Sequence, residues 1–237
     1  MLIKTRAIVI SALRYQEKSL VVKCFTREAG LKSYFIRDAF SNKKSAQKIA
    51  YFQPLNLLEI EATHKNKGNL EYLKEIRLAS PYLTINTNVV KSSLAVFLSE
   101  VLHHCIREEE KNDSLYTFLE TALLWLDTHD EVADFHLVLL MEVTKFLGFY
   151  PDNGNTSCEF FEMTDGVFTQ FQSLTCLSAE ETQLLRRLMA LRLDTGLRNF
   201  SVGERQSLLK IMMDYYAFHL DGFRRPKSAE VLREVFG

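Results

Sequence analysis

Long apolar runs are absent from this chain of 237 residues. A membrane-spanning helix needs about 20 consecutive apolar residues. The nearest candidate, LVLLM at 137–141, is far shorter and lies inside an amphipathic pattern. The first ten residues are interrupted by Lys4 and Arg6, so they lack the uninterrupted apolar stretch of a secretory signal. We therefore expect no membrane partner and a cytoplasmic location.

Paired cysteines are also absent. The four cysteines (Cys24, Cys105, Cys158 and Cys176) are scattered along the chain without a repeated spacing. With no export signal, this distribution is typical of reduced thiols in the cytoplasm and gives no reason to expect a disulfide framework.

Enzyme signatures are missing as well. The sequence contains no GxGxxG or GxxxxGK[ST] loop for phosphates, no GxSxG nucleophile elbow and no HExxH zinc motif. His103, His104 and Cys105 are adjacent, but consecutive helical residues point about 100° apart and cannot close on one metal ion. We expect no catalytic residue, no cofactor and no metal site.

The charge is unevenly distributed. The whole chain has a net charge of −1, but residues 1–50 hold 11 Lys or Arg against three acidic residues, a balance of +8. The remaining residues hold 18 basic and 27 acidic side chains, a balance of −9. Such a split indicates a polyanionic partner for the N-terminal part.

Alternation of apolar and polar residues predicts strands in the first 80 residues. The expected strands cover 5–11, 19–26, 31–38, 55–63 and 70–79, with Gly30 in the turn between the second and third. In the fourth, Leu58, Ile60 and Ala62 should point inward. Five short strands with a long connection after the third favour a small barrel of the OB type, and a five-stranded SH3-like barrel fits almost as well.

After Pro81 the apolar period becomes helical. We expect helices at about 90–105, from an N-cap at Asp113, from about Val132 to Gly148, and at 229–236. Ser178 with Glu181 and Ser201 with Glu204 have the spacing of capping boxes that open two further helices. The expected fold class is α+β with two domains. Residues 1–80 form an OB-fold DNA-binding domain, and residues 81–237 form an all-α domain with an insertion at 151–177.

The basic N-terminal module is the most informative feature. Cations neutralise phosphates, and aromatic rings give unstacked bases a surface on which to lie. We assign Phe25 and Phe35 to the core and Tyr34 to a base platform, because Tyr34 shares a strand face with Lys32. The fourth and fifth strands make a poor phosphate surface because they carry Glu59, Glu61, Glu71 and Glu75, so DNA should follow strands one to three and the 37–48 loop. The candidate DNA-binding residues are Lys4, Arg6, Arg14, Lys18, Lys23, Arg27, Lys32, Tyr34, Arg37, Lys43, Lys44 and Lys48.

Several stretches resemble the RecO family of bacterial recombination mediators. They are Tyr15–Glu17 after a hydrophobic strand, TREAG at 26–30, a basic loop, Gln53–Pro54 before the fourth strand, and YYAFHLDGFRRPKSAEVL at 215–232. The resemblance therefore involves both ends of the chain.

The resemblance implies a non-catalytic, nucleoid-associated protein that binds single- and double-stranded DNA. It also implies annealing of complementary single strands and help for RecA in displacing single-strand-binding protein, with RecR as a partner. The helical domain would then dock the acidic-hydrophobic tail of single-strand-binding protein. The candidate residues for that tail are Tyr215, Tyr216, Phe223, Arg224, Arg225 and Lys227.

Many members of this family carry four zinc cysteines in the region of the insertion at 151–177. Here Cys158 aligns with the first ligand, and Phe161, Phe168 and Phe171 fall at the other three positions. Since phenylalanine offers no ligand atom, we expect a degenerate, metal-free zinc-finger-like insertion held by an aromatic cluster. A zinc site built from Cys158, Cys176 and two distant histidines is the alternative.

Two other functional classes remain open. The first is a non-catalytic helical interaction scaffold whose barrel binds protein and not DNA. The second is a nuclease or hydrolase that uses an acidic cluster outside the known motifs.

Overall fold

A computed structural model describes residues 2–40, 48–64, 70–107, 110–194 and 198–236. The chain forms two compact units, residues 1–128 and 129–237. The first unit contains a β-barrel and helices, and the second contains further helices and a small sheet. The predicted domain boundary after residue 80 separates the barrel strands from the helices, whereas the compact units divide further along the chain. That boundary stays a prediction.

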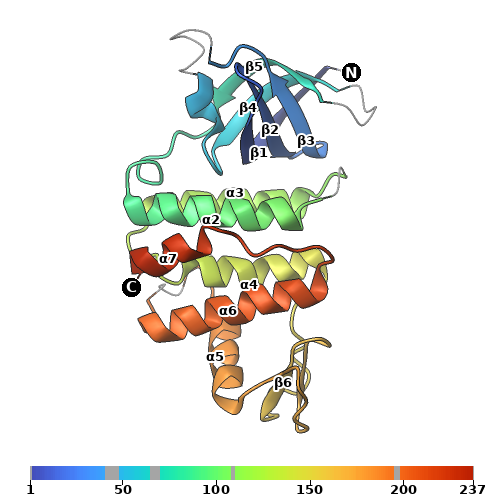
Figure 1. The fold of residues 1–237 in the computed structure, drawn as a ribbon, viewed down its shortest axis with the longest axis vertical. Helices are drawn as coiled ribbons and strands as arrows, with labels where there is room; N and C mark the ends of the chain where they lie inside the picture. The colour runs from blue at the N-terminus through green and yellow to red at the C-terminus, as the bar shows by residue number, and fades with distance from the viewer. Residues whose placement is uncertain (1, 41–47, 65–69, 108–109, 195–197, 237) are drawn as a thin grey trace. The chain divides into compact units, whose positions relative to one another are not determined.

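The N-terminal part is a five-stranded barrel, as the sequence predicted (Figure 1). The strands follow the order β3-β2-β1-β4-β5. A parallel bridge between Tyr34 and Glu71 closes the sheet, with Phe35 N donating to Glu71 O at 2.9 Å and Glu71 N donating to Ser33 O at 2.8 Å. Closure of β3 onto the start of β5 gives the OB type. The strand bounds are β1 (Leu2–Tyr15), β2 (Ser19–Thr26), β3 (Gly30–Ile36), β4 (Leu57–Thr63) and β5 (Tyr72–Leu78).

Strand β1 is longer than the predicted 5–11. Its first half pairs with β4 and its second half with β2, and a register shift between Val9 and Ser11 lets it serve both partners. Its ends alternate poorly in polarity, so the sequence pattern did not reveal them. The predicted inward face of β4 is confirmed, since Leu58, Ile60 and Ala62 are buried.

Within the described residues, the first unit also contains two long helices and one short 3₁₀ helix. These are η1 (Ala50–Phe52), α2 (Val89–Cys105) and α3 (Asp113–Thr128). The prediction that Asp113 caps α3 is wrong, because Leu115 N donates to the Asn112 side chain at 3.0 Å. The Asp113 carboxylate instead accepts a hydrogen bond from Arg27, so the neighbouring asparagine takes the capping role.

Asp127, at the end of α3, organises the segment that leads into α2. Its carboxylate accepts hydrogen bonds from the backbone N–H groups of Leu83, Thr84 and Ile85 at 2.8, 2.8 and 3.0 Å. Burial raises the pKa of this carboxyl, but the three donors outweigh it and hold the pKa below its usual range. The buried Lys91 donates to Thr84 Oγ1 at 2.7 Å and to the carbonyl oxygen of Asp127 at 3.1 Å. This network fixes the turn between barrel and helices.

The second unit contains α4 (Phe135–Leu147), α5 (Ala179–Ala190), α6 (Val202–His219) and α7 (Ala229–Phe236). Both predicted capping boxes are confirmed, at Ser178 and at Ser201. Gly148 ends α4 with φ of 82°, a conformation that glycine adopts without a Cβ clash. The helix α4 begins three residues later than predicted, and α7 has the predicted bounds.

The insertion forms a small sheet of β6 (Phe160–Glu162), β7 (Val167–Thr169) and β8 (Cys176–Leu177). Phe161 and Phe168 pack with ring centroids 5.0 Å apart, and Phe161 lies 5.8 Å from the ring of Tyr215 on α6. The predicted place of Phe171 in this cluster is wrong, because the residue is 84% exposed beyond the end of β7. Among the described residues, no group of three or more His, Cys, Asp or Glu could hold a metal ion. That the insertion binds no metal stays a prediction.

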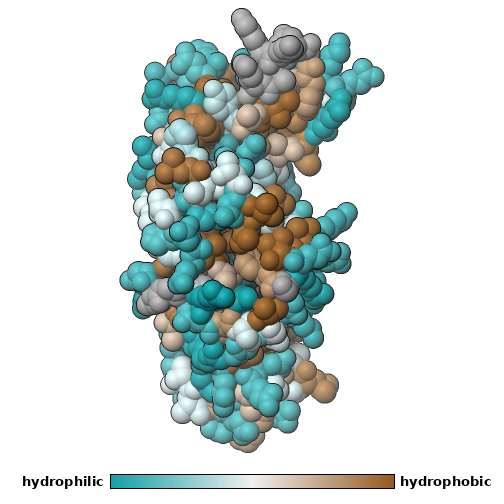
Figure 2. Space-filling view, turned by 90° about the vertical axis from the view of Figure 1, so that its left-hand side faces the viewer, coloured by the Kyte–Doolittle hydropathy of each residue, from teal (hydrophilic) through white to brown (hydrophobic). Residues whose placement is uncertain are grey.

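No helix within the described part of the chain is long and apolar enough to cross a membrane. On the face shown in Figure 2, hydrophilic residues are abundant and surround the areas of hydrophobic ones.

Candidate nucleic-acid interface

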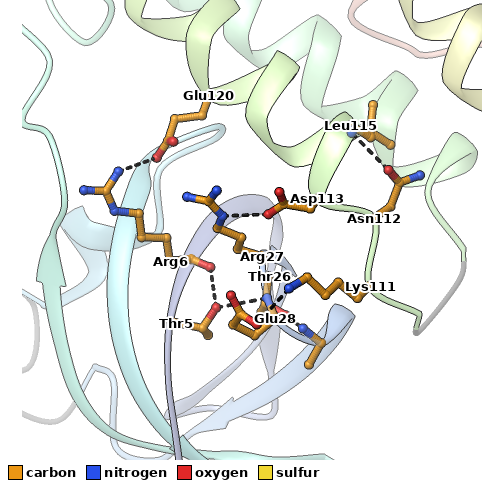
Figure 3. A network of polar contacts seen from close by, with 11 residues as sticks. Thr5, Arg6, Thr26, Arg27, Glu28, Lys111, Asn112, Asp113, Leu115 and Glu120 are labelled. Atoms are coloured by element: carbon orange, nitrogen blue, oxygen red, sulfur yellow. Dashed lines mark hydrogen bonds and ion pairs between the residues drawn. The ribbon is translucent and has the colours of Figure 1, made fainter.

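Three of the predicted DNA-binding cations are held in ion pairs within the first unit. Arg6 pairs with Glu120 of α3 at 3.1 Å and Arg27 pairs with Asp113 at 2.7 Å (Figure 3). Lys4 pairs with Glu61 at 3.2 Å. The hydrogen bond from Arg27 holds the pKa of Asp113 below its usual range, so this carboxylate is charged at neutral pH. Arg6 and Arg27 thus hold the barrel to α3, and the predicted basic stripe is interrupted there.

Two further candidates are buried in the barrel. Tyr34 is 0% exposed, and its hydroxyl shares a hydrogen bond of 2.8 Å with His64 Nε2. A buried ring cannot stack on a base, so Tyr34 is a core residue and not the base platform that the sequence suggested. Lys32 is also buried, on the same inward face of β3. The reason for the error is that Lys32 made this inward face look solvent-exposed.

The remaining candidates within the described residues lie at the surface. Arg14, Lys18, Arg37 and Lys48 are exposed and Lys23 is half-buried. Lys43 and Lys44 lie outside the described residues. Arg14 and Lys18 border the β1–β2 turn, at the opposite end of β2 from the Arg27–Asp113 pair. The cations at this end of the barrel do not take part in the ion pairs described above.

Aromatic rings lie among these exposed cations. The ring of Phe35 lies edge-to-face with Tyr15 at 5.9 Å and with Tyr72 at 6.3 Å between centroids. The Arg37 guanidinium lies 5.4 Å from the centroid of the Tyr72 ring. Arg14 lies 4.8 Å from the centroid of the Phe40 ring. We name the six residues Arg14, Tyr15, Phe35, Arg37, Phe40 and Tyr72 the aromatic–arginine surface.

Strand register explains why this surface forms. Val21 pairs with both Leu13 and Phe35, so these three side chains share a row across β1, β2 and β3. Their neighbours Val22 and Tyr34 are buried, which places the Phe35 row on the outer face. Tyr72 joins the row because β5 pairs with β3 at Glu71. Sequence reasoning missed Tyr72 because it excluded the fifth strand as a DNA surface and because Tyr72 lies 37 positions from Phe35 in the chain. It also assigned Phe35 to the core, whereas the residue is half-buried on the outer face.

The arrangement suits contacts with a nucleic-acid strand. Guanidinium groups bind phosphate oxygens through several donors, and exposed aromatic rings can stack on unpaired bases. In OB folds the outer face of strands two and three is a common site for oligonucleotides. The surface has no metal-binding cluster among its described residues.

The predicted tail-binding aromatics lie mainly in the core of the second unit. Tyr215 donates to the carbonyl oxygen of Phe149 at 2.8 Å and Tyr216 to that of Leu140 at 2.8 Å, and both are buried. They are therefore not available to a partner, which corrects the prediction. Phe223 is half-buried beside the Tyr216 ring at 5.5 Å.

The predicted tail-binding cations are exposed. They are Arg224, Arg225 and Lys227, of which Arg225 forms an ion pair with Asp214. Arg225 also lines a groove of about 290 Å³ between α6 and α7. Apolar Leu209 and Met213 line this groove, with the cations Lys210 and Arg233. We name it the α6–α7 groove.

Comparisons with known proteins cover nearly the whole chain. A family model described as "Recombination protein O N terminal" matches residues 1–82, and one described as "Recombination protein O C terminal" matches residues 86–229. The chain is 61% identical over 237 residues to the DNA repair protein RecO of Flavobacterium psychrophilum and 58% identical over 236 residues to that of Flavobacterium johnsoniae. It is 38% identical over 240 residues to that of Christiangramia forsetii. Each comparison covers 100% of both chains.

Proposed function

The chain belongs to the recombination protein O family of DNA repair proteins, and from this premise we propose that it is a DNA-binding recombination mediator. In this proposal it makes and breaks no covalent bond. It holds single strands, and duplex too, through phosphate contacts with little sequence preference. It anneals complementary strands and assists RecA on DNA covered by single-strand-binding protein, with RecR as partner.

One observation carries the proposal, namely the aromatic–arginine surface on the outside of the barrel. Two guanidinium groups and four rings lie together there, at the end of β2 away from the ion pairs with α3. Positive charge that faces solvent lowers the repulsion between two strands brought close together, so pairing becomes faster. The paired cations Arg6 and Arg27 are not needed for this function.

Salt titration tests DNA binding. If the surface neutralises about four phosphates of a single strand, log affinity should fall against log salt with a slope of about −3. Fluorescence anisotropy with labelled oligonucleotides at several salt concentrations measures this slope. Absence of binding at low salt, or a slope near zero, would contradict the proposal and favour a protein-binding scaffold.

We also place the tail of single-strand-binding protein in the α6–α7 groove. Its apolar floor with flanking Lys210 and Arg233 matches a peptide that is both acidic and apolar. Changing Lys210 and Arg233 together to Glu should weaken binding of the C-terminal peptide at least about tenfold, because charge-assisted hydrogen bonds are lost. Isothermal titration calorimetry measures the affinity. The matched control is the double change of Arg224 and Lys227, exposed cations that do not line the groove; an equal loss there would refute the assignment.

A further inference from the structure

We propose that Tyr15, Phe35 and Tyr72 form a stacking platform for unpaired bases and give the barrel a preference for single strands over duplex. This inference rests on the proposed function, since it assumes that the aromatic–arginine surface is where DNA binds. It goes further because it assigns separate roles to the two kinds of side chain. The rings distinguish single strands from duplex, and the cations bind both.

The exposure of the rings is the first argument. Tyr15 is 47% exposed and Tyr72 is 40% exposed, whereas the inward-facing side chains of the same barrel form a closed core. Tyr34, which itself bridges to Glu71 where the barrel closes, is fully buried. An aromatic ring that stays in contact with water does not contribute the free energy that its burial would give to the fold. Exposed apolar side chains that cluster together are typical of binding sites.

The geometry of the rings is the second argument. Phe35 lies between Tyr15 and Tyr72, and its plane is turned 82° from the first and 90° from the second. Each tyrosine is thus braced against a half-buried ring that is anchored in β3. Rings held in this way lose little conformational freedom when a base stacks on them.

The neighbouring guanidinium groups are the third argument. Arg37 lies over the Tyr72 ring, and Arg14 lies over the Phe40 ring and donates to the carbonyl oxygen of Glu17 at 2.8 Å. A single strand can place a base on a ring while its phosphate meets the adjacent guanidinium. In a duplex the bases are already stacked and paired inside, so the same rings meet only sugar and phosphate. The rings therefore add affinity for single strands alone.

The test compares three ligands of equal length: a single-stranded thymidine oligonucleotide, the same backbone with abasic sites, and a duplex. The variant carries Tyr15→Leu and Tyr72→Leu, which keeps apolar bulk against Phe35 and removes two π faces. Since stacking contributes about 1–3 kcal/mol per base, affinity for the thymidine strand should fall about tenfold or more. Affinities for the duplex and the abasic strand should stay within about twofold, because neither offers an unpaired base.

Phe171→Leu is the matched control, since it removes an exposed ring from the second unit and should change none of the three affinities. Circular dichroism shows whether each variant is folded. The inference is overturned if the double variant loses thymidine strand and duplex equally, or if the unchanged protein binds the abasic strand as tightly as the thymidine strand. Both of these outcomes leave DNA binding itself intact. Failure of the unchanged protein to bind any of the three ligands overturns the proposed function together with the inference.

Discussion

Changing Arg14 and Arg37 together to Glu is expected to lower affinity for single strands and duplex alike by about a hundredfold at moderate salt. Each guanidinium is exposed beside a ring, and each loses a charge-assisted phosphate contact of about 1.5–3 kcal/mol, or at least about tenfold in affinity. Loss of two contacts should also make the salt slope shallower by about 1.4 for single strands. Anisotropy titrations at several salt concentrations measure both quantities.

The matched control for this variant is the double change of Arg224 and Lys227 to Glu, which alters net charge by the same amount in the second unit. It should leave affinity within about threefold, because these two cations are not part of the aromatic–arginine surface. If both double variants lose affinity to the same degree, the effect comes from net charge and the aromatic–arginine surface is not the binding site.

Replacing Asp127 with Ala is expected to destabilise the first unit by about 3 kcal/mol. The carboxylate is 5% exposed and accepts from three consecutive backbone N–H groups, which would lose their acceptor inside a part-buried turn. Buried donors without a partner cost about 1–3 kcal/mol each, and local relaxation with water entry recovers part of that cost. Urea denaturation followed by circular dichroism measures the change.

Two further variants serve as controls for the loss of stability in Asp127→Ala. Asp127→Asn keeps a carbonyl acceptor and should lose about half as much stability, because charge contributes only part of each bond. Asp130→Ala removes an exposed carboxylate three residues away and should be neutral within about 0.5 kcal/mol. A midpoint for Asp127→Ala equal to that of the unchanged protein would mean that the turn is held by other contacts.

Local patterns were sufficient to predict most elements of the fold. Alternation located the barrel strands, and the spacing of Ser178 with Glu181 and of Ser201 with Glu204 identified two helix starts. These features depend on neighbours within a few residues, so they can be read from one sequence. The preference for an OB barrel over an SH3-like one needed the pairing of Tyr34 with Glu71, which no local pattern encodes.

The candidate site was harder to predict because it depends on contacts between distant residues. The sequence identified cations but not which of them α3 would neutralise, and Arg6 and Arg27 are paired with residues more than 80 positions away. Alternation in β3 was correct, but Lys32 on the inward face led to the wrong choice of exposed ring. Tyr72 became part of the surface only through barrel closure. The types of the side chains in the candidate site could therefore be read from the sequence, but not which of them contact one another.

The division of β1 between two partners has a consequence for synthesis of the protein. Residues 2–8 pair with 57–63, and β3 is covered only when Glu71 arrives. A nascent chain that ends near residue 50 therefore has a three-stranded meander with two open edges, one along the start of β1 and one along β3. Unpaired edges recruit other chains. Ribosomal pausing or truncation in that interval should therefore favour aggregation, and release of the chain beyond β5 should end the hazard.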